Sequence, residues 1–124
     1  MNLSIKVNAL LEAQIQFKIL HWQTKGYARH KAFGEMYDDL GDLIDDYVEV
    51  SMGKVGRFVV DDATNTITYK NLKDVSIVDF LQDFKSKLWS LTEELDNVKD
   101  TDLLNIRDEI LAKTNKLAYL LTLD

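Results

Sequence analysis

The chain has 124 residues, of which 46% are hydrophobic and 29% are charged, a composition typical of a globular protein and not of a disordered one. Its formal net charge is −6 and it has no Lys/Arg-rich tail, which argues against DNA binding because a phosphate backbone requires a basic face. The absence of cysteine excludes disulfides, thiolate metal ligands and cysteine nucleophiles. No apolar run approaches the roughly 18 residues of a membrane span and no secretory signal is visible. We therefore expect no membrane association and a cytoplasmic location.

The spacing of apolar residues predicts an all-α protein with one domain over residues 1–124, built as a four-helix bundle. The expected helices cover residues 3–24, 28–52, 77–97 and 101–122, and no proline interrupts them. Gly26 follows the last periodic residue of the first helix, which predicts a left-handed C-terminal stop there. The first helix is apolar on two sides, so we expect a second covering surface, supplied by another subunit.

In residues 57–70, the apolar residues no longer follow the helical spacing. Two β-branched and aromatic runs, at residues 58–60 and 66–69, flank a polar segment at residues 61–65. This pattern predicts a small β-hairpin in the connection between the second and third helices. A two-stranded hairpin is marginal alone, so we expect it to pack on the helices or on a partner.

The second expected helix carries four carboxylates on one stripe, namely Asp38, Asp42, Asp45 and Glu49. Asp45 and Glu49 are four residues apart, which places both on one helical face where they could share a divalent cation. Oxygen ligands alone favour Mg, Ca or Mn. The plainer interpretation is a solvated acidic face.

His21 and His30 bracket the turn between the first two expected helices. Imidazole ligands would shift the metal preference towards Fe, Zn or Mn, whereas the plainer interpretation is that the rings pack or cap a helix. Gly34 and Gly41 lie seven residues apart inside the second helix, where each glycine costs about 1 kcal/mol. Either another backbone or a metal centre approaches closely there, or the glycines are merely tolerated.

The segment from His21 to Glu49 resembles the signature of the Dps proteins, the miniferritins of the ferritin-like superfamily. The matching residues are His21-Trp22, Lys25-Gly26, His30 with Tyr37, and Asp45 with Glu49. The resemblance implies a ferritin-like bundle that binds iron, as a di-iron or mono-iron centre, with Zn or Mn as alternatives. It implies His21, His30, Asp45 and Glu49 as metal ligands, the histidines from one subunit and the carboxylates from another. It therefore also implies a homodimer or larger homo-oligomer.

The chain departs from this signature at one ligand position. Many members carry a carboxylate four residues after the second histidine, where this chain has Gly34, with Glu35 beside it as a substitute. The chain also resembles short, uncharacterised ferritin-like proteins of tailed bacteriophages, which share the HWQTK pattern and a Gly-Lys-x-Gly-Arg segment, here residues 53–57. For a phage protein, the expected location is the host cytoplasm.

Three functions are compatible with these patterns. The first is a Dps-like protein that binds iron and oxidises Fe(II). The second is a phage-type structural or interaction protein on the same bundle, without redox activity. The third is an all-α nucleotide pyrophosphohydrolase, for which Glu93 and Asp96 would join Asp42 and Asp45 around Mg²⁺. The chain contains no Glu-x-x-His, so a metal site inside one bundle is disfavoured, and no motif predicts catalytic side chains.

Overall fold

A computed structural model describes residues 2–123 as an all-helical protein. Its helices are α1 (Leu3–Gln23), α2 (Tyr27–Val55), α3 (Ile77–Thr92) and α4 (Thr101–Leu120). Two short 3-10 turns, η1 (Asp62–Thr64) and η2 (Leu72–Asp74), lie between α2 and α3. The expected all-α fold with four helices is confirmed. Within residues 2–123, no helix is both long enough and apolar enough to cross a membrane.

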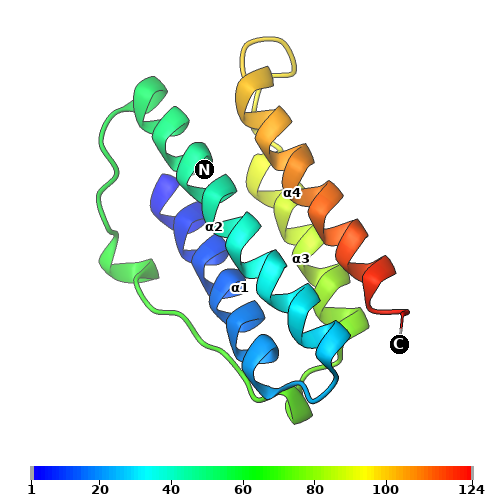
Figure 1. The fold of residues 1–124 in the computed structure, drawn as a ribbon. Helices are drawn as coiled ribbons and strands as arrows, with labels where there is room; N and C mark the ends of the chain where they lie inside the picture. Colours follow the sequence, from blue (N-terminus) through cyan, green and yellow to red (C-terminus); the bar gives the residue numbers. More distant parts are fainter. Residues whose placement is uncertain (1, 124) are drawn as a thin grey trace.

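The long connection after α2 decides the arrangement of the helices. It leaves one end of the bundle and returns along α1 to the opposite end, so that α3 runs in the same direction as α2 (Figure 1). α1 packs mainly on α2, α2 also packs on α4, and α4 packs on α3. Each of these neighbouring pairs is antiparallel (Figure 1).

Large apolar side chains fill the space between the helices. Phe17 and Leu20 of α1, Phe33 and Leu40 of α2 and Ile110 of α4 are at most 1% exposed. Burying each such side chain contributes about 1.5–3 kcal/mol, so these positions dominate the stability of the bundle. The ring of Phe17 also contacts the rings of Phe80 and Phe84 in α3, at centroid distances of 5.0 and 5.8 Å.

α3 ends at Thr92, five residues before the end predicted at residue 97. The reason is a local turn, in which the Asp96 carboxylate accepts hydrogen bonds from the backbone N–H groups of Val98 and Lys99 at 2.8 Å. Such side-chain acceptors compete with helical bonds. Leu95 still packs against the core, which is why the apolar spacing continues beyond the helix.

The prediction that Gly26 is a left-handed stop was wrong, and α2 ends later than predicted. Gly26 has φ −80° and is the N-terminal cap of α2, whereas Thr24 caps the C-terminus of α1. The left-handed glycine is Gly56, with φ 97°, which ends α2 three residues after the predicted residue 52. α2 therefore continues through Gly53 because the helix tolerates a glycine in its last turn.

The β-hairpin predicted for residues 57–70 is also wrong, because residues 2–123 contain no strand. Instead, residues 66–72, which we call the strap, follow α1 as a single segment (Figure 1). The β-branched residues do favour an extended backbone, but the partner is a helix and not a second strand.

Side chains of α1 accept the backbone hydrogen bonds that a second strand would accept in a hairpin. The backbone N–H groups of Thr68, Lys70 and Leu72 donate to carboxylate or amide oxygens of α1 at 2.9, 2.8 and 2.7 Å. The three acceptors are Glu12, Gln16 and Gln23. The donors alternate along the strap, as the N–H groups on one edge of a strand do.

A buried lysine links the other end of α1 to its neighbours. Lys6 is 5% exposed, and its Nζ lies 2.5 Å from Glu94 Oε1 and 3.4 Å from the Tyr47 hydroxyl. Burial raises the pKa of Tyr47, and the nearby Lys6 charge offsets only part of that effect. Burial also acts to raise the pKa of Glu94, but hydrogen bonds from Lys6 and the backbone outweigh it, so this pKa lies below its ordinary value.

Gln16→Met tests the attachment of the strap. Gln16 is 7% exposed and bonds both the N–H and the C=O of Lys70, at 2.8 and 3.0 Å. Methionine keeps the length of the side chain but removes both bonds, so we expect a loss of about 1–2 kcal/mol in urea unfolding. Gln23→Met is the control, because Gln23 is exposed and water can replace its bonds. Equal losses would contradict the special role of Gln16.

Glu94→Gln tests the buried lysine. It leaves the Lys6 ammonium without its carboxylate, and because Glu94 is partly exposed we expect a loss of about 1–2 kcal/mol at pH 7. Since the folded pKa of Glu94 is lowered, the pair stabilises the protein above the unfolded pKa of about 4.3 and its contribution fades as pH falls through the folded value. The variant should therefore match wild type in acid. Exposed Glu93→Gln is the control; a Glu94→Gln penalty that persists unchanged at pH 3 would refute this account.

Candidate metal centre

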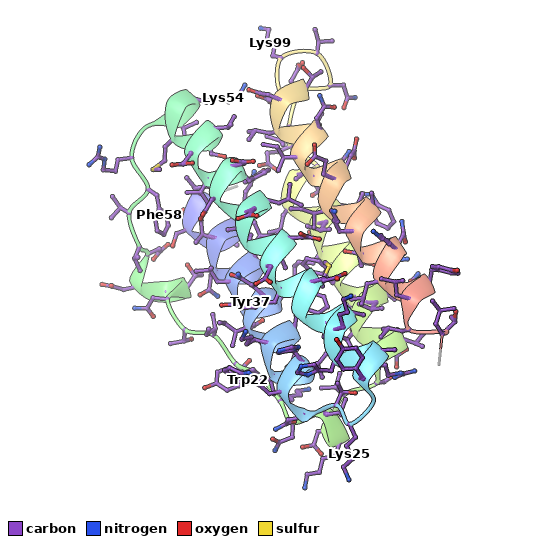
Figure 2. The ribbon with its side chains drawn as sticks, viewed as in Figure 1. Trp22, Lys25, Tyr37, Lys54, Phe58 and Lys99 are labelled. Atoms are coloured by element: carbon purple, nitrogen blue, oxygen red, sulfur yellow. The ribbon has the colours of Figure 1, made fainter. Side chains whose placement is uncertain are left out.

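His21, in the last turn of α1, and His30, in the first turn of α2, form a reciprocal pair. His21 Nδ1 lies 2.6 Å from the carbonyl oxygen of His30, and His30 Nδ1 lies 2.8 Å from the carbonyl oxygen of His21. The two rings are stacked, with centroids 3.9 Å apart and planes inclined by 21°. Figure 2 shows this end of the bundle near Trp22 and Lys25, opposite the end marked by Lys54 and Lys99.

These two bonds determine which nitrogen of each ring carries the hydrogen. A carbonyl oxygen only accepts, so Nδ1 is the donor in both His21 and His30. In the tautomer that these bonds select, the lone pair of each imidazole lies on the other nitrogen, Nε2. A backbone carbonyl that fixes one nitrogen in this way is typical of histidines that bind a metal through the other. The pair is thus prepared to supply two imidazole ligands.

The two glycines of α2 make room for polar side chains of α1. A Cβ atom at Gly34 would lie 2.8 Å from both Cε1 and Nδ1 of the His21 ring. A Cβ atom at Gly41 would lie 2.8 Å from Nε2 of Gln14. The expected close approach at these glycines is therefore made by side chains of the neighbouring helix, and Gly34 allows the His21 ring to reach the carbonyl of His30.

The predicted carboxylate ligands lie elsewhere on α2. Asp45 and Glu49 are both exposed, one turn apart on the same side of the helix. Fifteen residues separate His30 from Asp45, which is about 22 Å along the helix axis. One subunit therefore does not bring the four predicted ligands together. Accordingly, residues 2–123 contain no group of three or more His, Asp or Glu side chains that could hold a metal ion.

Glu35 does not substitute for the missing carboxylate near the histidines. It lines a shallow groove between α2 and α4 together with Asp39, Lys113 and Lys116. Its neighbour Gly34 faces α1, so the side chain of Glu35 projects from a different side of α2.

The interior of the bundle has a different chemistry. The buried polar side chains among the described residues are Ser4, Lys6, Gln16, Ser51, Thr92 and Thr114. None of these is a carboxylate or an imidazole. A small cavity beside Lys6 and Tyr47 is also lined by Arg107, so the polar groups around it include two cations. The interior is therefore a poor place for a divalent metal.

The outer face of α1 remains open beside the acidic stripe of α2. On this face, Leu11 is 38% exposed and Trp22 is 64% exposed, although the strap covers another flank of α1. Lys18 Nζ lies 5.3 Å from the Trp22 ring centroid and 4.5 Å from that of Tyr37, so cation–π contacts link the two helices here. The described residues thus leave uncovered the surface for which a second subunit was expected.

Gly34→Ala tests the packing of the His21 ring. Alanine should favour the helix by about 1 kcal/mol, but its Cβ must displace His21 and break the bond to the carbonyl of His30. We therefore expect no net gain in the free energy of unfolding. Gly53→Ala is the control, because nothing lies within 4 Å of its Cβ position. It should stabilise the protein by about 0.5–1 kcal/mol. Equal gains in thermal unfolding would show that His21 is not held as described.

Comparisons with known proteins give a family but no activity. Over 48 residues, the chain is 46% identical to an uncharacterised 14.6 kDa protein from the mobD-ri intergenic region of Enterobacteria phage T4. That match covers 39% of this chain and 38% of the phage protein, and no solved structure matches the chain. The likeness agrees with the expected relation to phage proteins. Residues 21–121, which include both histidines and both carboxylates, match a family of unknown function (DUF5856). The chain therefore belongs to this family.

Proposed function

We propose that the protein is a ferritin-like metal-binding protein, with iron as its metal, bound at a site between two subunits. One subunit supplies His21 and His30, and the other supplies Asp45 and Glu49. The observation that carries the proposal is the reciprocal histidine pair, which leaves Nε2 of both rings available as a ligand.

The position of the ligands supports a shared site. α2 carries an imidazole at one end and two carboxylates towards the other. A two-fold axis perpendicular to α2 near its middle brings the histidines of each subunit towards the carboxylates of the other, which forms two equivalent sites. The open apolar side chains of α1, including Leu11 and Trp22, lie on the face that such a dimer would bury.

Two imidazoles and two carboxylates suit Fe, Zn or Mn. The resemblance to Dps proteins implies oxidation of Fe(II) by peroxide or oxygen, in which bound iron supplies the redox chemistry. The residues of this chain would hold the metal and orient the imidazoles. Because this chain has Gly34 in place of a further carboxylate, water or the oxidant would supply the ligand that the carboxylate supplies in the Dps-like pattern.

A second candidate is a structural or interaction protein without redox activity. The observation that favours it is the His21 ring against Gly34, which fills the space where the Dps-like pattern has a carboxylate. On this alternative, the bundle and the dimer face are kept, whereas oxidation is absent.

An anaerobic Fe(II) titration followed by peroxide separates the two candidates, with near-ultraviolet absorbance as the readout. Saturable binding followed by rapid oxidation supports the ferritin-like redox function. Saturable binding without oxidation leaves a metal site that is not redox-active. No saturable binding contradicts the metal site, and chelator-indifferent assembly would then favour the structural alternative.

Mixing two defective variants tests the location of the site. His21→Ala and Asp45→Ala should each abolish tight Fe(II) binding while circular dichroism shows unchanged helicity. If each site uses both subunits, a heterodimer of the two variants has one intact site and one doubly altered site. Random exchange of equal amounts should then restore roughly a quarter of the wild-type sites. No recovery in the exchanged mixture would place the ligands within one chain, and binding that survives in the double variant would refute the assignment.

A further inference from the structure

The edge of the strap that faces away from α1 is separate from the proposed metal site. α1 holds the N–H groups of Thr68, Lys70 and Leu72, and Gln16 also binds the C=O of Lys70. In an extended segment, the N–H and C=O of one residue point to the same edge, and those of the next residue point to the opposite edge. The backbone groups of Ile67 and Tyr69 therefore face away from α1.

This outward edge has no partner in the described chain. Within residues 2–123, no hydrogen bond involves the backbone N–H of Ile67 or Tyr69, whereas each neighbouring even-numbered residue from 68 to 72 has one. The side chain of Tyr69 is 56% exposed, and Thr66, Thr68 and Lys70 are exposed as well. Accessible donors and acceptors on an extended, β-branched segment are a template for strand addition.

We infer that this edge pairs with the same edge of a second copy of the chain, as an antiparallel two-stranded ribbon centred on Thr68. The partner is a second copy because the sequence is complementary to itself in this register. Ile67 lies opposite the partner subunit's Tyr69, and Thr68 lies opposite the partner subunit's Thr68. Aromatic–β-branched pairs and Thr–Thr pairs are both favourable across strands.

The charges agree with this register. Lys70 lies opposite the partner subunit's Thr66, so that the two lysines do not face each other. The outward groups of Ile67 and Tyr69 supply four backbone hydrogen bonds across the two-fold axis. A ribbon of two strands is marginal alone, so this contact is weak and is best detected by trapping it.

A single cysteine traps the contact, because the natural chain has none. In this register, Thr68 and its copy form a non-hydrogen-bonded pair with Cα atoms about 4.5 Å apart, which suits a disulfide. Thr66 and its copy are roughly 13 Å apart, beyond the reach of one. Mild oxidation should therefore convert Thr68→Cys to a covalent dimer and leave Thr66→Cys monomeric on non-reducing gels. The reaction is run with chelator, so that its result does not depend on the metal site.

Two further measurements make the result decisive. Tyr69→Pro removes an outward N–H and should slow cross-linking of Thr68→Cys at least several-fold, with helicity unchanged by circular dichroism. Wild-type chain should show weak self-association in sedimentation that Tyr69→Pro reduces. Equal cross-linking of Thr66→Cys and Thr68→Cys would indicate random collision, and no cross-linking of Thr68→Cys would indicate no pairing. Either result overturns the inference, as does wild-type sedimentation that Tyr69→Pro leaves unchanged.

Discussion

The close contact between α1 and α2 is the constraint on which the other features of the protein depend. The His21 side chain packs against Gly34, and the Gln14 side chain packs against Gly41. The two glycines are seven residues apart on α2, as are the two polar residues on α1. This register allows the two histidines to bond each other's carbonyl groups across the short turn. At the far end of α1, the same register brings Lys6 to Tyr47.

The same contact explains why two glycines persist in a long helix. Each costs about 1 kcal/mol relative to alanine. At Gly34 the return is two imidazole–carbonyl hydrogen bonds and a stacked pair of rings. Because the net contribution of each such bond is also about 1 kcal/mol, the two bonds together outweigh the cost of the one glycine by only about 1 kcal/mol. The main effect of the arrangement is to fix the orientation of the rings, which is what a ligand site requires.

The sequence was sufficient to predict elements that depend on local pattern. Apolar spacing predicted four helices, and the N-terminal end of α3 depends on a local cap, in which Ser76 accepts a hydrogen bond from the N–H of Asp79 at 3.4 Å. Prediction from the sequence failed where the local structure depends on contacts between residues far apart in the chain. The β-branched residues of the strap are extended, but no local signal shows that Gln16, some fifty residues earlier, would satisfy them instead of a strand. The available signal was the spacing of Glu12, Gln16 and Gln23 by four and seven residues, which places three polar side chains on one side of the helix.

The candidate site shows the same division. The turn and the two helices that it joins place His21 and His30 together, and that proximity follows from their spacing around a short turn. The role of Gly34 could not be derived from the pattern, because it depends on which side of α1 faces α2. The separation of Asp45 from the histidines does follow from helix geometry, and it is the reason why the site, as proposed, needs a second chain.

The attachment of the strap also affects how this sequence can diverge. Gln16 hydrogen-bonds main-chain atoms of Lys70. Glu12 and Gln23 also accept from the main chain, but each bonds a strap side chain as well, at Thr68 and Asn71. Bonds to the backbone do not depend on which side chain the strap residue carries, whereas the bonds to Thr68 Oγ1 and Asn71 Oδ1 do. Strap residues other than Thr68 and Asn71 can therefore change without loss of a hydrogen bond to α1, provided that proline does not replace a donor at 70 or 72. Selection on this segment can accordingly act on what its outer surface meets, while α1 keeps it in place.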